Sequence, residues 1–124
     1  MSESKEFHIG DILSVLSGKL VSPSHIGGVY AICDWMTDRA NMTHQLPRVS
    51  REIAPQLRDD FPELAAVEVP AGLNSEDKVL SFLASLDMGE TRMVERLRDP
   101  ADHTDIDPIA EIRMINPNAK IIAI

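Results

Sequence analysis

The sequence predicts an α+β fold, a mainly helical single domain with a small C-terminal β element. Apolar residues recur at three- and four-residue spacing after the prolines at positions 23 and 47, which indicates two amphipathic helices. A third amphipathic helix is expected after Asn74. Over residues 91–97 the spacing changes to two, and the final run KIIAI is β-branched and suits a buried strand. The chain is therefore expected to combine helices with one small sheet.

Length, charge and cysteine content narrow the class of protein. We expect one domain over residues 1–124, with a loose tail at 1–5 and a connecting loop at 65–74. The formal net charge of -8 argues against general nucleic-acid or anionic-membrane binding, because Lys and Arg hold such surfaces. A single cysteine, a polar start and the lack of any run of ~20 apolar residues are typical of a cytoplasmic protein. Solubility explains the acidic charge most simply. The alternatives are a basic partner and a protein that occupies a nucleic-acid channel by imitation.

The first elements are expected near the start of the chain. Phe7 and Ile9 alternate with a polar residue, which predicts a short strand. Asp11 is the expected N-cap of a helix with the sequence DILSVLSG, and Gly18 is expected to end it. The apolar stripe of this helix would contain Ile12, Val15 and Leu16. A tight hairpin turning at Ser17 and Gly18 is the alternative interpretation.

A second helix is expected to start at Ser22 and Pro23, because serine caps helix starts and proline is tolerated at the first helical position. Its buried stripe would contain Ile26, Val29, Tyr30, Cys33 and Met36. Gly27 and Gly28 allow two alternatives, a helix that begins only after them or a close approach by a neighbouring backbone. Cys33 is expected to pack in the core and not to act as a nucleophile.

A third helix is expected to begin at Leu46 and Pro47, where proline again opens a helix. The buried stripe would contain Val49, Ile53 and Leu57. Pro55 is expected to kink or split this helix, because an interior proline removes a backbone hydrogen bond and costs ~3 kcal/mol. Pro62 is expected to end it.

The remaining elements follow the connecting loop. Asn74 is the expected N-cap of a helix that Gly89 ends. Its stripe would contain Val79, Phe82, Leu83 and Leu86. Residues 91–97 are expected to form an edge strand that pairs with the run at 120–124. A short helix is expected over residues 108–114.

The loop THQLPR contains the first candidate binding residues, His44, Gln45 and Arg48. A histidine just before a helix start can act as a base, a metal ligand or a phosphate contact. Arg51 and Arg58 extend this site into a basic ridge, whose guanidinium groups can bind a carboxylate-rich partner or a nucleic-acid backbone. The structural alternatives are a histidine that braces the loop and arginines that pair with the acids of the same chain.

The segment DHTDIDP is the second candidate site. His103, Asp105 and Asp107 place an imidazole and two carboxylates at alternate positions, which can converge on a metal ion. Together with His44 and Asp102 they would suit a small metal-dependent hydrolase. The alternative is an acidic turn that caps the next helix, because the central glycine and downstream glutamate of a calcium loop are missing. No phosphate loop, CxxC, GxSxG or HExxH motif occurs, and no cofactor is expected.

Several stretches carry a resemblance to a known group of proteins. They read FHIGDILSVLSGKLVSP, GVYAICDWMTD and THQLPR, followed by APQL at 54–57 and FPEL at 61–64. The chain resembles a group of small uncharacterised bacteriophage and prophage proteins in which GDxLSVxxGxLVSP, GVYxIxxxMT and THQLPR motifs recur. A His-x-x-IDP segment of that group is matched by residues 103–108. The resemblance covers residues 7–64 well and 103–112 loosely, and it implies an accessory role in phage biology.

Size, charge and the lack of a catalytic constellation favour a binding module over an enzyme. The resemblance implies a phage-encoded protein that acts in the host cytoplasm on a host or defence-system protein, as an inhibitor of that protein. The metal-dependent hydrolase is the first alternative, and a structural or assembly component of the phage is the second. Neither membrane contact nor general nucleic-acid binding is expected.

Overall fold

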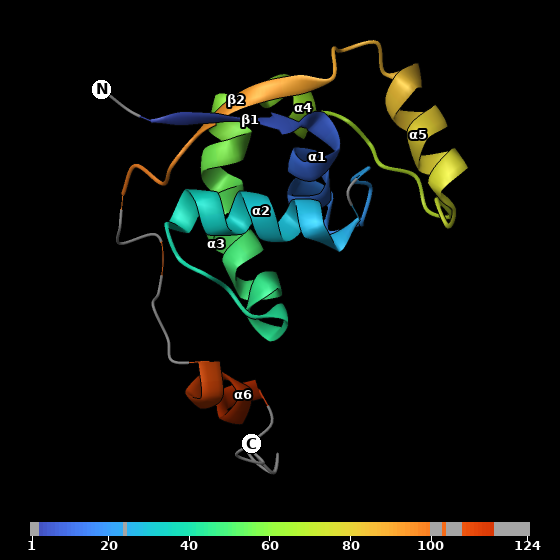
Figure 1. Ribbon diagram of the computed structural model, residues 1–124. Helices are drawn as coiled ribbons and strands as arrows, with labels where there is room; N and C mark the ends of the chain where they lie inside the picture. Colours follow the sequence, from blue (N-terminus) through green and yellow to red (C-terminus); the bar gives the residue numbers. More distant parts are fainter. Residues whose placement is uncertain (1–2, 24, 100–102, 104–107, 116–124) are drawn as a thin grey trace.

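Three helices and a two-stranded sheet form the centre of the structure, which is a computed structural model describing residues 3–23, 25–99, 103 and 108–115 (Figure 1). The sheet lies across the top of the view, α1 and α3 run down from it, and α2 crosses in front of α3. The helices at the centre are α1 (Ile9–Ser17), α2 (Ile26–Thr37) and α3 (Leu46–Asp60). This arrangement confirms the predicted α+β class with one small helical domain.

The sheet pairs a strand near the start of the chain with one that follows α5 (Glu76–Ser85). Strand β1 (Ser4–His8) runs antiparallel to β2 (Thr91–Glu95). The predicted strand over 91–97 is thus present, but its partner is β1, and the expected partner at 120–124 lies outside the described residues. The expected loose tail at 1–5 is wrong for its last two residues, because the backbone of Ser4 and Lys5 pairs with β2 although both side chains are exposed.

Helix α1 starts three residues earlier than predicted. Its N-cap is His8, whose Nδ1 accepts a hydrogen bond of 3.0 Å from the backbone N–H of Gly10. The prediction of Asp11 as the cap is wrong, because that carboxylate turns inward to Ser22. Gly18 ends the helix at φ 72°, as predicted, and the alternative hairpin at this glycine is wrong.

Helix α2 starts later than predicted. His25 is its N-cap at φ 54°, and the prediction that Ser22 and Pro23 open the helix is wrong because the Ser22 hydroxyl donates to Asp11. Most of the predicted stripe is buried, at Val29, Cys33 and Met36. Ile26, at the first position of the helix, was expected in the core and is instead 47% exposed.

Gly28 marks the closest contact between α2 and α1. A Cβ added at Gly28 would lie 2.8 Å from Cγ of Asp11, and closer still to Oδ1 of Asp11 and the Ser22 hydroxyl. An alanine therefore does not fit without displacing this buried hydrogen-bonded pair. The alternative of a helix that begins only after the glycine pair is wrong, because α2 begins at Ile26. A close approach does occur at Gly28, but the atoms that approach belong to side chains and not to a neighbouring backbone as expected, whereas a Cβ at Gly27 would meet nothing within 4 Å.

Helix α3 begins at Leu46, as predicted, and buries the predicted stripe of Val49, Ile53 and Leu57. The expectation that Pro55 splits the helix is wrong, since α3 continues to Asp60. Pro55 lies on the exposed side of α3, opposite the buried stripe, so water can solvate the backbone carbonyl that the proline leaves without its helical partner. Pro62 separates α3 from the short helix α4 (Pro62–Ala65).

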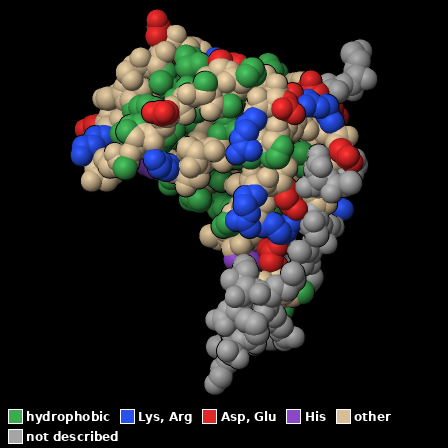
Figure 2. Space-filling view, turned by 180° about the vertical axis from the view of Figure 1, so that it is seen from behind, with side chains coloured by type: hydrophobic (Ala, Val, Ile, Leu, Met, Phe, Trp, Pro, Cys, Tyr) green, Lys and Arg blue, Asp and Glu red, His purple; other side chains and the backbone are tan. Residues whose placement is uncertain are grey.

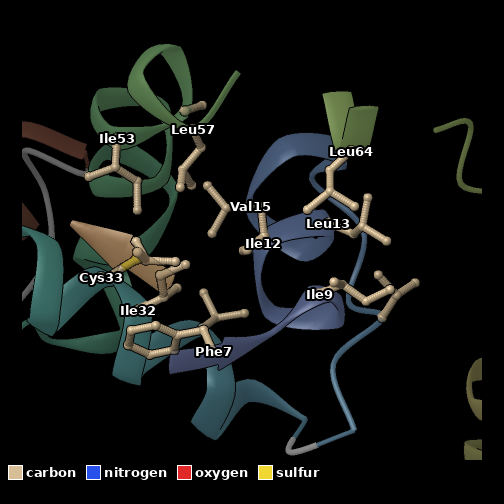
Figure 3. Packing of buried hydrophobic residues seen from close by; sticks show 14 of the residues in the cluster. Phe7, Ile9, Ile12, Leu13, Val15, Ile32, Cys33, Ile53, Leu57 and Leu64 are labelled. Atoms are coloured by element: carbon tan, nitrogen blue, oxygen red, sulfur yellow. The ribbon is translucent and has the colours of Figure 1, made fainter. Parts of the chain in front are cut away.

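The core lies between α1, α2 and α3 and is closed by residues of β1 and α4 (Figure 3). Ile12 and Val15 from α1 point toward Ile53 and Leu57 from α3, while Phe7 of β1 lies next to Ile32 of α2. Each of these side chains is at most 6% exposed. Helix packing of this kind is the main source of stability in a small domain.

The elements after residue 65 lie around this core. Residues 66–74 contain no helix or strand, and α5 (Glu76–Ser85) stands to the side of the helical body in Figure 1. The N-cap of α5 is Ser75 and not Asn74 as predicted, because the Ser75 hydroxyl accepts from the N–H of Lys78. Helix α6 (Pro108–Ile115) occupies nearly the predicted range. None of the described helices is both long and apolar enough to cross a membrane.

Two polar side chains of the core helices hold the chain around the end of β2. Trp35 Nε1 donates to the carbonyl of Val94 at 2.9 Å. The Gln56 amide binds the backbone on both sides of Leu97, donating to the carbonyl of Arg96 and accepting from the N–H of Arg98, each at 2.9 Å. The glutamine of the APQL stretch therefore has a structural role, because it replaces the partners that a neighbouring strand would supply.

Candidate binding groove

A groove of about 630 Å³ lies between the C-terminal half of α1 with its following loop, the first turn of α2 and one side of α3. We call it the α1–α3 groove. Its apolar lining includes Leu16, Leu20, Ile26, Val29, Leu46 and Ala54. Leu20 is 46% exposed and Ile26 is 47% exposed, so two large hydrophobic side chains remain in contact with water here. The groove thus offers apolar surface that no described residue covers.

The charged residues of the groove are all cations. Lys19, Arg51 and Arg58 line it, and no Asp or Glu among the described residues does so, although the chain has a net charge of -8. The Lys19 ammonium donates to the carbonyl of Val69 at 2.7 Å. Figure 2 shows the molecule from behind, with Lys and Arg side chains bordering exposed hydrophobic surface. The local charge of the groove is therefore opposite to that of the whole chain.

Arg51 and Arg58 differ from the other arginines in their surroundings. Both are exposed, and neither makes an ion pair with any described residue. By contrast, ion pairs form at Arg48, Arg92, Arg96 and Arg98. The structural alternative, that the arginines pair with acids of the same chain, therefore holds for Arg48 and not for the two arginines of the groove.

Arg48 lies outside the groove and anchors the C-terminal helix. Its Nε donates to Oε1 of Glu111 in α6, and a terminal guanidinium nitrogen lies 2.9 Å from Oε1 of Glu52. Burial lowers the pKa of Arg48, but the two carboxylates outweigh this effect and hold the pKa above its ordinary value. Oε2 of Glu111 is buried without a hydrogen-bond partner. Arg48 is thus permanently charged, and its guanidinium group pairs with two carboxylates of the same chain.

The candidate metal ligands are only partly described. His103 Nδ1 lies 2.9 Å from Oε1 of Glu52, the same carboxylate oxygen that pairs with Arg48. Asp105 and Asp107 lie outside the described residues. Within the described part of the chain, no group of three or more His, Cys, Asp or Glu side chains is placed to hold a metal ion. The proposed ligand set therefore has no observed geometry in its favour.

The THQLPR loop is a helix start and not a separate site. Thr43–Gln45 form the short 3-10 helix η1, directly followed by α3. Gln45 is buried, and its Oε1 accepts from the N–H of Met42 at 2.9 Å. His44 is half-buried at this junction and does not line the groove. Of the five predicted binding residues, only Arg51 and Arg58 share a common open surface.

The remaining reactive group, Cys33, is sealed in the core. Burial raises the pKa of its thiol from 9.0 to about 11, against a smaller opposite effect of the Ser50 hydroxyl 3.8 Å away. The thiolate that nucleophilic chemistry needs is therefore scarce at neutral pH. This agrees with the expectation that Cys33 packs and does not react.

Sequence reasoning did not identify the opposite wall of the groove. Lys19 and Leu20 follow directly after Gly18, which ends α1, and this position in the sequence could have predicted that they are exposed. A leucine placed in a loop just beyond a helix stop has no helical face to bury it. Ile26 was assigned to the core because its spacing fits the stripe of α2.

A comparison with protein families matches part of the chain. Residues 7–67 match the model of a family described as a domain of unknown function (DUF7736). No curated protein and no solved structure matches the chain. Every residue that lines the α1–α3 groove lies within the matched range, whereas His103 and Glu111 lie beyond it. The groove therefore lies within the part of the chain that matches the family model.

Proposed function

We propose that this protein is a non-enzymatic module that binds another protein through the α1–α3 groove. The observation that supports this most strongly is the pair of unpaired arginines, Arg51 and Arg58, beside the exposed side chains of Leu20 and Ile26. Apolar surface with a charged rim is the usual composition of a protein interface, and arginine is enriched in such surfaces.

The groove favours binding over catalysis because of the side chains that it lacks. No described His, Cys, Asp or Glu lines it, so its serine and threonine hydroxyls have no general base within the groove. The described imidazole of His103 is held by Glu52 on a different side of α3. The groove can therefore bind and orient a partner without the groups needed for acid–base chemistry.

The target in this proposal is a host or defence-system protein, and the origin is a phage or prophage. This part is supported by the resemblance of the GDxLSV, GVYxI and THQLPR stretches. The groove adds a physical requirement, because its charge selects a partner surface that is acidic and apolar. Inhibition would follow if that surface is one that the target needs for its own work.

The test is a capture experiment from lysates of candidate bacterial hosts. The immobilised protein is compared with a double variant, Arg51→Glu with Arg58→Glu, and with the control Lys78→Glu, which changes a charge on α5 away from the groove. We expect a protein that binds the wild type and the control but not the double variant. The captured protein must then form a complex of fixed stoichiometry when both components are pure. A partner that binds all three forms equally would show that the groove is not the binding surface.

A further inference from the structure

We infer that the α1–α3 groove receives an amphipathic α-helix of its partner, with two acidic residues seven positions apart on its apolar face. This inference rests on the proposed function and specifies the shape and charge pattern of the partner. It follows from the positions of the two arginines that make no ion pair with a described residue, from the surface between them and from the lack of a matching helix among the described helices.

The spacing of the two arginines sets the spacing of the acids. Arg51 and Arg58 are seven residues apart on α3, which is about 10 Å along the axis and nearly two full turns. Both side chains therefore leave the helix on the same side. A partner that engages both guanidinium groups needs two carboxylates at about the same distance.

This distance suits a helix better than an extended segment. Acids seven positions apart on a helix lie on one face, also about 10 Å apart. On one face of an extended strand, acids lie about 7 Å or about 13 Å apart, because only alternate residues share a face and each residue advances about 3.3 Å. A helix that lies along α3 can therefore place one carboxylate at each of the two arginines, whereas a strand can place a carboxylate at only one of them.

The surface next to the arginines has the size and polarity for such a helix. On α3 the lining of the groove includes Pro47, Ser50 and Ala54, whose short side chains leave room for a partner helix close to the α3 backbone. Leu20 and Ile26 stand at the other side with nearly half of their surface exposed. Apolar residues between the two acids of the partner would reach this lining, as in other complexes where a helix lies in a groove.

The described helices of a second copy of this chain do not fit as the occupant. Among the described helices, the acids spaced seven apart are Glu52 and Asp59 of α3. Glu52 is already bound to Arg48 and to His103, and its side chain is only 14% exposed. A nucleic acid fits poorly as well, since the groove is largely apolar and the chain is strongly acidic.

The experiment measures binding of two synthetic 15-residue helical peptides, about four turns long, by fluorescence anisotropy. The matched peptide carries two glutamates seven positions apart with two leucines between them on the same face. The control peptide has the same composition, with both glutamates moved two positions along and so onto the opposite face. We expect the matched peptide to bind about tenfold more tightly than the control, because only its acids and leucines reach the groove together.

Charge exchange tests the register. The Arg51→Glu, Arg58→Glu double variant should bind the matched peptide about tenfold more weakly, and a peptide with lysines in place of the two glutamates should bind this variant and not the wild type. Circular dichroism and urea unfolding of the double variant show that it is folded, and Lys78→Glu should leave both affinities unchanged.

Defined outcomes overturn the inference. They are no binding of the matched peptide, equal binding of both peptides, or no restoration by charge exchange. Binding of dodecanoate, but not of the peptide, in a manner that needs both arginines would assign the groove to a small anionic amphiphile. In one further outcome, the double variant fails to capture the host protein and the matched peptide does not bind the wild type. This result would support the proposed binding function of the groove and refute only the inference that its partner is a helix.

Discussion

Residues 7–67 hold their elements together in a different way from the described residues that follow. In the first region, which we call the N-terminal body, helices bury apolar faces against one another, and it contains sixteen of the twenty buried hydrophobic core residues in the described structure. The later region contributes Val69, Val79, Leu83 and Val94. Much of its attachment is polar, through Gln56, through Arg48 and Glu111, and through Lys19. The N-terminal body is therefore expected to supply most of the free energy of unfolding, while the later elements depend on a few contacts each and can open separately.

The largest expected effect compares one substitution in the two regions. Leu57→Ala in α3 should lower the free energy of unfolding by about 3–5 kcal/mol, because the side chain is fully buried and leaves a cavity. Leu83→Ala in α5 should lower it by about 2 kcal/mol or less, since α5 stands at the side of the body and its surroundings can close the gap. Urea unfolding of both variants measures the difference. Equal losses would contradict the division into a body and an attached region.

The second prediction concerns the contact between α1 and α2. Gly28→Ala should destabilise the protein by about 2–4 kcal/mol, because the added methyl group displaces the buried pair of Asp11 and Ser22. Gly27→Ala is the matched control and should stabilise by about 0.5–1 kcal/mol, since alanine favours the helix and meets no neighbour. Thermal and urea unfolding give both values. A Gly28→Ala protein as stable as the wild type would remove this contact as the reason for the glycine.

The third prediction tests how well the N-terminal body excludes water. In the folded protein burial raises the pKa of the Cys33 thiol to about 11, whereas the pKa of an unfolded cysteine is 9.0. Stability contributed by the neutral thiol is complete below pH 9 and declines as pH rises toward 11, by up to about 3 kcal/mol. The difference in unfolding free energy between wild type and Cys33→Ala, measured from pH 8 to pH 11, isolates this decline. A difference that stays constant with pH would contradict it.

The smallest global effect is expected in the later region. Glu111→Ala removes the acceptor of Arg48 in α6, but Arg48 keeps Glu52 and α6 can open without unfolding of the N-terminal body, so the global free energy of unfolding should fall by about 1 kcal/mol or less. Hydrogen exchange of the α6 amides should accelerate at least about tenfold while α3 is unchanged. The control Glu63→Ala breaks the exposed pair with Arg92 and should leave α6 unaffected. A global loss of several kcal/mol would show that α6 belongs to the body.

The same division explains what the sequence could predict. Helical stripes such as Val49, Ile53 and Leu57 follow directly from periodicity, because each helix of the body buries one face. Helix starts were less certain, since His8 and Ser75 cap helices where Asp11 and Asn74 were expected. All four are ordinary capping or polar residues, and only tertiary contacts such as that of Asp11 with Ser22 decide between them.

Part of the candidate site was also predictable. Arg51 and Arg58 were singled out because they share a side of one helix, and they do line the groove. The difference between these two arginines and Arg48 was not visible, because the acid that binds Arg48 from α6 is 63 positions away. The pairing of β2 with β1 was not visible in the sequence for the same reason, as local patterns carry no information about pairing across the chain, and the expected pairing of 91–97 with 120–124 stays a prediction.

The pairing of Ser4–His8 with Thr91–Glu95 also affects how the protein is made. The first strand is made long before its partner exists, and at synthesis rates of about 5–20 residues per second the interval is several seconds. During this time the edge of β1 that pairs with β2 has no partner, although Phe7 of β1 can already pack next to Ile32 of α2 (Figure 3). The sheet can therefore be completed only after all the residues between its two strands have been made.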